Sequence, residues 1–304
     1  MNEFSVTILG SSSAIPTSTR FPSAQLVSHN YKLFLVDCGE GAQIQLRKNQ
    51  IRFSKIHHIF ISHMHGDHFF GLIGLISTFN LLGRKMGLHI YAPMEIEQVL
   101  ENQLHVTQTK LNFAIHYHFL DFNTRSLIFE NKELEIYSFP LNHSIPTCGF
   151  LFKEKAHPRK IKKSVLSKYA IADSKFEGIK QGDDFIDTEG NLIPNDVLTT
   201  AGNPRKSFAY CSDTAYSKTL SSYIKGVDLV YHECSFMEDM RKTAEEKMHA
   251  TTYDAAQVAK EAGAKRLLIG HYSARYKDIK PILLETQSKF ANTLIAIEGL
   301  KIEV

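Results

Sequence analysis

The segment IFISHMHGDHFFG, residues 59–71, brings three histidines and one aspartate into six consecutive positions between two apolar runs. Imidazole and carboxylate groups are ligands suited to zinc and related divalent ions, and a loop leaving a strand can turn several of them toward one point. With fifteen histidines in 304 residues, this spacing arises by accident on the order of once in several hundred chains. The segment therefore predicts a metal site that includes His63, His65, Asp67 and His68.

Other polar residues also stand where predicted strands end. His143 follows LEIYSFPLN, Asp213 follows SFAYCS, and His271 follows KRLLIG. The carboxyl ends of strands are where α/β folds place their sites. We therefore expect these three side chains to lie near the histidine cluster.

The spacing within the cluster divides it into two pairs. His63 and His65 share one side of an extended segment and can hold one ion, whereas Asp67 and His68 lie beyond the bend and can hold a second. Neither pair fills a coordination sphere. The candidates for the missing donors are His143 at the first ion, His271 at the second, and Asp213 as a carboxylate that bridges both.

The pattern of apolar residues predicts strands mixed with helices. FSVTILG, KLFLVDCG, HHIFIS and GLHIYAP are typical of strands, and FFGLIGLISTFNLLG, residues 69–83, is long and apolar enough for one buried helix. TTYDAAQVAKEAG predicts a helix that ends at Gly263, and NTLIAIEGLKIEV has the alternation of a strand. This order indicates sheets covered by helices, with residues from about 153 to 206 as an excursion from the core.

The charge of the chain is small overall but unevenly distributed. The formal net charge is +3, yet residues 153–180 hold nine Lys or Arg and three acids. Such a run is compatible with a solvated loop or with an electrostatic handle for a polyanion.

Several classes of protein are disfavoured by the composition. The N-terminus lacks a basic region followed by an apolar core, and no apolar stretch approaches the ~18 residues needed to span a bilayer. The four cysteines are scattered, without the pairing of a disulfide scaffold or a zinc knuckle. We therefore expect a cytoplasmic protein that is neither secreted nor membrane-spanning.

Other candidate residues are given lesser roles. Asp37, in LVDCG at the end of a strand, is expected to orient a ligand histidine. Four further histidines have no polar companions in the sequence and are interpreted as surface or core residues without a role in the site. They are His57, His58, His116 and His118.

Motifs along the whole chain resemble the metallo-β-lactamase superfamily and, within it, the ribonuclease Z family of tRNA 3′-processing endoribonucleases. The matching stretches are TILGSSSAIPT, LVDCGEGAQIQL, SHMHGDHFFGLIGL, NHSIPTCGF, YCSDTAYS, LVYHECSF, HATTYDAA and GHYSARY. The HxHxDH motif specifies only the superfamily, and HATTYDAA followed by GHYSARY narrows the resemblance to ribonuclease Z. The resemblance implies a single αββα sandwich domain over residues 1–304, with two mixed sheets flanked by helices and a protruding arm.

The resemblance also implies the chemistry of the site. It assigns two Zn²⁺ ions per subunit, Asp67 as the proton acceptor, and His249 as the proton donor to the leaving 3′ oxygen, with Glu233 orienting His249. The implied reaction is phosphodiester hydrolysis that removes the 3′ trailer from precursor tRNA and leaves a 3′-hydroxyl. One ion would be held by His63, His65, His143 and Asp213, and the other by Asp67, His68, Asp213 and His271.

The insertion at residues 153–204 corresponds to the basic arm, or exosite, that grips the tRNA body in this family, which also implies a homodimer. The chain departs from the family in its N-terminal PxKxRN loop, which reads PTSTRF at residues 16–21, and in its arm, which has SKFEGIKQGDD instead of a Gly-Pro-rich turn. Two rival functions stay open at this point. One is another dinuclear-zinc hydrolase of the same fold, such as a small phosphodiesterase, arylsulfatase or thioesterase, and the other is a non-catalytic RNA-binding relative.

Overall fold

The computed structural model describes residues 3–304, which form two compact units. Unit 1 contains the chain up to residue 129 together with residues 136–152 and 207–304, and unit 2 contains residues 130–135 and 153–206. Within residues 3–304, no helix combines the length and the apolar character needed to cross a membrane.

Unit 1 contains two seven-stranded mixed sheets. In the first, β1 pairs with its neighbours antiparallel, whereas β3, β4, β5 and β6 are parallel; in the second, β14 to β17 are parallel. The first sheet has the order β18 (Lys301–Glu303), β1 (Phe4–Gly10), β2 (Ala24–His29), β3 (Lys32–Val36), β4 (Ile56–Phe60), β5 (Leu88–Ala92) and β6 (Ile115–Phe119). The second has the order β17 (Thr293–Ile295), β16 (Arg266–Gly270), β15 (Leu229–Glu233), β14 (Ser207–Cys211), β9 (Thr147–Glu154), β8 (Leu134–Leu141) and β7 (Ser126–Glu130).

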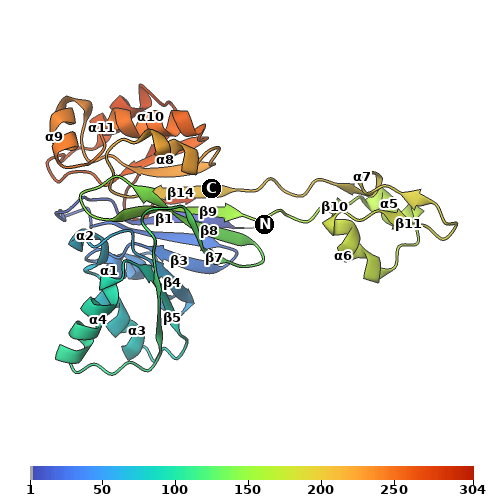
Figure 1. The fold of residues 1–304 in the computed structure, drawn as a ribbon, viewed down its shortest axis with the longest axis horizontal. Coiled ribbons are helices and arrows are strands. Elements are labelled where there is room, and N and C mark those ends of the chain that lie inside the picture. Colours follow the sequence, from blue (N-terminus) through green and yellow to red (C-terminus); the bar gives the residue numbers. More distant parts are fainter. Residues whose placement is uncertain (1–2) are drawn as a thin grey trace. The chain divides into compact units, whose positions relative to one another are not determined.

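Helices cover the outer face of each sheet, so the layers run helix, sheet, sheet, helix (Figure 1). Apolar side chains of both helical layers pack against buried strand residues, which confirms the predicted αββα sandwich. The first layer contains α1 (Ala42–Lys48), α2 (Gly66–Phe69), α3 (Leu72–Leu81) and α4 (Glu95–Val106), with the 3-10 turn η1 (Phe53–Lys55) between α1 and β4. The second contains α8 (Lys218–Tyr223), η2 (Glu238–Met240), α9 (Arg241–Glu246), α10 (Thr252–Ala262) and α11 (Lys280–Gln287).

Aromatic side chains join the two sheets face to face. Phe60 of β4 packs edge-on against Phe150 and Phe152 of β9, with ring centroids 5.5 and 5.9 Å apart. Phe34 of β3 also meets Phe152, at 5.9 Å. Each of these rings is fully buried, and edge-to-face aromatic pairs add to the stabilisation from burial alone. The strand ends that carry the polar residues are therefore fixed by a rigid core.

The apolar segment 69–83 does not form the single helix that its length predicts. The chain forms α2 and α3 instead, and Gly71 between them donates its N–H to Cys38 O at 2.9 Å. A Cβ atom on Gly71 would lie 2.2 Å from Gly39 O, so this close approach requires glycine. The break turns α2, with its aspartate and histidine, toward the strand ends.

The C-terminal segment NTLIAIEGLKIEV is not one strand. Its first part forms β17 at the edge of the second sheet, and its last part forms β18 beside β1 in the first sheet. Gly299, with φ +85°, lies in the turn that separates them. The alternating apolar pattern does not distinguish one strand from two strands that cross between sheets.

Four histidines gather on one face of β4, β5 and β6. The rings of His58 and His89 stack with centroids 5.1 Å apart, those of His89 and His116 lie 4.8 Å apart, and His89 Nδ1 is 2.9 Å from His118 Nε2. Burial, reinforced by the charge of neighbouring histidines, lowers the pKa of His58 to about 3 and also lowers the pKa of His89. The parallel register of β4, β5 and β6, which the sequence does not reveal, creates this histidine stack.

The histidine stack should make unit 1 sensitive to acid. In the unfolded chain His58 binds a proton below about pH 6.5, whereas in the folded protein it stays neutral until about pH 3. The free energy of unfolding should therefore fall as pH decreases from 6.5 toward 3. Urea unfolding at about pH 7 and about pH 5 measures this change. Between these two pH values, the free energy of unfolding of the His58→Phe variant should fall by roughly 1 kcal/mol less than that of the wild type, after allowance for partial solvent exposure. Equal losses in both proteins would show that His58 does not carry this dependence.

Unit 2 has a small core of its own. Buried Val165, Ile179, Phe185 and Leu198 pack together, with four partly buried apolar residues around them. Asn195 supports this core by donating hydrogen bonds from Nδ2 to the carbonyls of residues 179 and 183, at 2.7 and 2.6 Å. Its elements are β10 (Lys160–Ile161), α5 (Lys163–Lys168), α6 (Asp173–Gln181), β11 (Phe185–Ile186), β12 (Leu192–Ile193), α7 (Asn195–Leu198) and β13 (Thr199–Thr200).

Candidate metal centre

The structure brings the seven predicted metal ligands together in unit 1. Each lies where a strand ends or in the short helix α2 that follows β4, and their ligand atoms form two groups in which every atom lies within 4.8 Å of the others. We call the seven residues the ligand cluster. One group contains His63, His65, His143 and Asp213, and the other contains Asp67, His68, Asp213 and His271.

Asp213 connects the two groups. Its Oδ2 atom lies 3.7 Å from His63 Nε2 and 3.8 Å from His143 Nε2. Its Oδ1 atom lies 3.3 Å from His68 Nε2 and 3.2 Å from His271 Nε2. One oxygen therefore faces each group, which is the arrangement that a carboxylate bridging two cations needs.

Two atoms of the ligand cluster are buried without a hydrogen-bond partner among the described residues. They are Asp213 Oδ1 and His68 Nε2. Buried polar atoms are normally hydrogen-bonded, and an exception needs an explanation such as an ion. Nitrogen and carboxylate donors in two groups of four match the coordination of zinc and similar divalent metals. The residues present therefore fit a pair of divalent ions.

Outer partners hold the second ring nitrogen of several ligand histidines. A ring nitrogen that donates its proton outward leaves the other nitrogen as an acceptor facing inward, so these contacts fix the tautomer that a metal requires. The contacts are His68 Nδ1 with Asp37 Oδ2 at 2.7 Å, His143 Nδ1 with Met248 O at 2.9 Å, and His271 Nδ1 with Ser235 Oγ at 2.9 Å.

Asp37 is the residue on which these outer contacts converge. Fully buried, it accepts hydrogen bonds from the backbone and hydroxyl of Ser62 at 2.8 and 2.9 Å, and from Tyr210 of the opposite sheet at 2.6 Å. Its backbone has φ +54°, an uncommon conformation for a non-glycine residue. The sequence predicts that Asp37 orients a histidine but gives no sign that Ser62 and Tyr210 support it.

The electrostatics prepare the ligand cluster for cations. Burial would raise the pKa of Asp213, but the imidazoles of His271 and His68 hold it well below its usual range, so the carboxylate is ionised. Burial lowers the pKa of His63 and His143, which keeps both imidazoles neutral, as ligation requires. At His68 burial is outweighed by the carboxylates of Asp213, Asp67 and Asp37, which raise the pKa well above its usual range, so an ion bound there would replace the inner proton of this imidazole.

His249 lies beside the ligand cluster and contacts Glu233. Its ring centroid is 5.0 Å from that of His143 and 5.4 Å from that of His271, and its Nδ1 lies 2.7 Å from Glu233 Oε1. Burial would lower the pKa of His249, but the buried Glu233 carboxylate raises it to about 9. Glu233, His249 and His271 could also form a third metal group. The 2.7 Å contact favours a shared proton over an ion between His249 and Glu233.

The backbone at His271 is strained. Its φ of +62° is left-handed, a conformation that costs a non-glycine residue on the order of 1 kcal/mol or more and that clusters at functional sites. The preceding residue, Gly270, approaches Tyr231 so closely that an added Cβ would lie 2.3 Å from the phenol oxygen. These two residues turn the His271 side chain away from the line of β16 and into the ligand cluster.

The fold and the site define the class of protein. The chain aligns with the metallo-β-lactamase fold protein YhfI from Bacillus subtilis at a TM-score of 0.70, with 18% identity and all of both chains covered. It also aligns with the short form of human tRNase Z at a TM-score of 0.72, with 25% identity and 99% of both chains covered. The protein therefore has the metallo-β-lactamase fold, with a cluster of histidine and aspartate side chains that could hold metal at its strand ends.

Sequence relatives give the family. The chain is 45% identical to ribonuclease Z from Porphyromonas gingivalis and 43% identical to ribonuclease Z from Bacteroides fragilis, in each case over 304 residues and the full length of both chains. It belongs to the ribonuclease Z family and, over residues 4–158, also matches the model of the family described as Anti-Pycsar protein Apyc1. That match covers no residue beyond 158 and so excludes Asp213 and His271, whereas the ribonuclease Z relatives match over the whole chain. The resemblance inferred from the motifs is confirmed.

Proposed function

We propose that this protein is a zinc-dependent endoribonuclease that removes the 3′ trailer from precursor tRNA and leaves a 3′-hydroxyl on the tRNA. The observation that carries the proposal is the pair of four-residue donor groups joined by Asp213, in a chain that matches ribonuclease Z relatives over its full length. When bound, a pair of Zn²⁺ ions lowers the pKa of water and stabilises negative charge on a phosphodiester.

The chain's own residues handle the protons. Burial would raise the pKa of Asp67, which is only 9% exposed, but the nearby charge of His68 and the hydrogen bond from His271 lower it, so the carboxylate is ionised. It is placed to accept the proton that the attacking water loses. His249, held by Glu233, donates a proton to the 3′ oxygen as the bond from phosphorus to that oxygen breaks. The trailer then carries the phosphate.

A His249→Ala variant should separate proton donation from metal binding. We expect kcat for precursor tRNA to fall by about 10²-fold or more, because a positioned proton donor contributes 10²–10⁴-fold. The metal content, measured by elemental analysis, should equal that of the wild type, since Glu233 holds His249 through a proton. Loss of an ion together with activity would instead make His249 a ligand of the third group.

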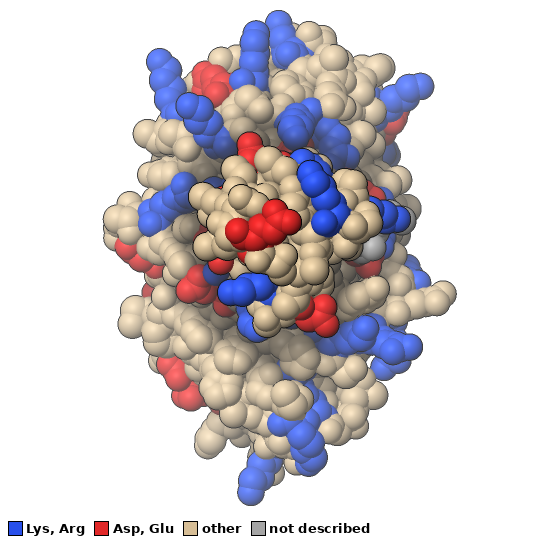
Figure 2. Space-filling model, turned by 90° about the vertical axis from the view of Figure 1, so that its right-hand side faces the viewer, with Lys and Arg blue, Asp and Glu red and all other residues tan. Residues whose placement is uncertain are grey.

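Unit 2 is proposed to grip the tRNA as an exosite. Lys163, Lys168, Lys175 and Lys180 are exposed, and within residues 3–304 none forms an ion pair with an acid. On the face drawn in Figure 2, basic and acidic side chains are interspersed. The proposed exosite therefore consists of these four lysines and not of a continuous positively charged surface. Phosphate contacts of this kind supply affinity without reading the sequence, which suits a folded RNA.

We make three further assignments, of the partner, the assembly and the cellular compartment. We also propose precursor tRNA as the partner, which the name of human tRNase Z supports, and, from the family resemblance of the motifs, a homodimer as the assembly and the cytoplasm as the compartment. Sedimentation of the purified protein tests the dimer directly.

The decisive experiment is incubation of the zinc-loaded protein with a 3′-extended tRNA. The cut should map to a single phosphodiester 3′ of the discriminator nucleotide, with a 3′-hydroxyl on the tRNA product. A second incubation uses the same RNA with its acceptor stem unpaired, which should be cut far more slowly. Indiscriminate cleavage of both RNAs, or none of either by metal-loaded protein, would overturn the proposal.

A further inference from the structure

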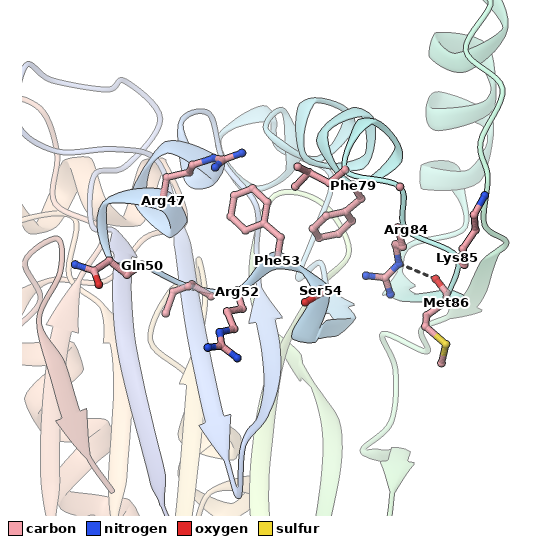
Figure 3. Close-up of a pocket in the computed structure, with 12 residues that line it drawn as sticks. Arg47, Gln50, Arg52, Phe53, Ser54, Phe79, Arg84, Lys85 and Met86 are labelled. Atoms are coloured by element: carbon pink, nitrogen blue, oxygen red, sulfur yellow. Dashed lines mark hydrogen bonds between the residues drawn. The ribbon is translucent and has the colours of Figure 1, made fainter.

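Unit 1 contains a second candidate site, a cavity of about 690 Å³ at the start of β4 (Figure 3). Residues from α1, from the segment between α1 and η1, from η1, from α3 and from the segment after α3 line it. We call it the basic pocket. Figure 3 shows the rings of Phe53 and Phe79 at its centre, with Arg47 to the upper left, Arg52 below, and Arg84 and Lys85 to the right.

The basic pocket is separate from the ligand cluster. η1 immediately precedes β4, whereas His63 follows the end of that strand. Five residues of strand span about 16 Å, so the two sites lie at opposite ends of β4. No residue of the ligand cluster lines the pocket.

The lining of the basic pocket includes four Lys or Arg side chains and no acid. Residues 41–94 contain six Lys or Arg but a single acid, Asp67, which belongs to the ligand cluster. The exposed side chains of Arg52 and Lys85 form no hydrogen bond or ion pair within the described part of the chain. These cations are therefore available to an anion from outside.

Arg84 has a different role, because the protein itself satisfies its guanidinium. It donates to Met86 O at 2.7 Å, Ile56 O at 2.8 Å and Gly87 O at 2.7 Å, and it lies 5.0 Å from the Phe79 ring centroid. Arg47 similarly lies over Phe53, at 5.1 Å, but makes no such hydrogen bonds. Arg84 thus forms a fixed wall, and Arg47 remains free to bind.

Apolar side chains complete the rim. Leu82 is 59% exposed and Met86 is 66% exposed, although both are large and apolar. Cavities of a few hundred cubic ångströms with an apolar lining and a few polar groups are typical of small-molecule sites. A ligand that covers this rim needs an anionic part for the cations and a flat apolar part for Leu82 and Met86.

We propose that the basic pocket binds a nucleotide unit, with its phosphate on Arg47, Arg52 and Lys85 and its base over Leu82 and Met86. Arginine and lysine provide charge-assisted hydrogen bonds to phosphate oxygens, and methionine adapts to flat ligands. The nucleotide is either free in solution or part of an RNA strand. Binding of a free nucleotide does not depend on the function proposed above.

The first test measures binding of adenosine 5′-monophosphate to the metal-loaded protein by calorimetry. The double variant R52A/K85A should bind it about tenfold or more weakly than the wild type, because two charge-assisted contacts are lost. Adenosine, which lacks the phosphate, should bind the wild type weakly as well. The control Lys225→Ala, another exposed lysine of unit 1, should bind the nucleotide like the wild type.

The second test distinguishes the two sources with precursor tRNA. If the pocket holds a nucleotide of the substrate, R52A/K85A should raise KM with kcat unchanged; if it holds a free nucleotide, KM should not change. Equal affinity of wild type and R52A/K85A for adenosine 5′-monophosphate would overturn the proposal, and so would an equal loss in Lys225→Ala. If precursor tRNA is not a substrate at all, the calorimetry still decides whether the site exists.

Discussion

Replacement of Asp213 by asparagine should lower kcat for precursor tRNA by about 10³-fold or more and reduce the bound metal from about two ions per chain to about one. Asparagine keeps the shape of the side chain but loses the charge, and one of its two outward atoms becomes an amide nitrogen that cannot bind a cation. Since each oxygen of Asp213 faces a different donor group, either orientation of the amide leaves one group without its shared ligand. Elemental analysis and single-turnover cleavage measure the two effects.

The control for this variant is Asp278→Asn, which changes an exposed aspartate of the same unit. It should retain wild-type metal content and activity. Circular dichroism of both variants establishes that the fold is intact. A folded Asp213→Asn protein with wild-type turnover would contradict the bridging role.

Removal of most of unit 2 should strongly reduce cleavage of precursor tRNA while sparing hydrolysis of a small diester. Residues 156–204 can be replaced by a short glycine linker, because Glu154 N donates to Lys206 O at 3.0 Å, so the two ends of the segment already meet. The core of unit 2 consists of its own residues, and its loss leaves the sandwich core intact. We expect kcat/KM for precursor tRNA to fall by about 10²-fold or more, and that for bis(p-nitrophenyl) phosphate to stay within about threefold.

A charge-reversal variant supplies the matched comparison. Changing Lys163, Lys168, Lys175 and Lys180 to glutamate keeps the fold of unit 2 and should weaken tRNA binding with a shallower dependence on salt. An equal fall of both activities in the folded linker variant would show that unit 2 is not an exosite. That outcome would favour another hydrolase of the same fold.

Residues at strand ends were the features that the sequence alone predicted best. His143, Asp213 and His271 are far apart in the chain, yet each follows an apolar run, and the structure brings all three to one place. For Asp213 and His271 the physical reason is that β14, β15 and β16 run parallel, so their carboxyl ends lie at the same edge of the sheet. A polar residue that directly follows a short apolar run can therefore be expected at the edge of a sheet where the strands end.

Features that depend on register or on close backbone approach could not be predicted. Tyr210 reaches Asp37 only because the two sheets face each other, and no local pattern marks that pairing. The histidine stack likewise depends on the alignment of β4, β5 and β6. The break at Gly71 follows from a tertiary contact with Cys38, which overrides the helical pattern of the segment.

The donors of the ligand cluster come from both sheets and from both sides of the unit 2 insertion, with Asp67 in the first sheet's half and Asp213 and His271 in the other. Ions bound there would connect the two halves of the sandwich. Each tenfold rise in free metal above its dissociation constant would add about 1.4 kcal/mol per ion to the folded state by mass action. A cell short of metal would thus lose folded enzyme to proteolysis as well as turnover, so the abundance of the protein should follow the metal supply.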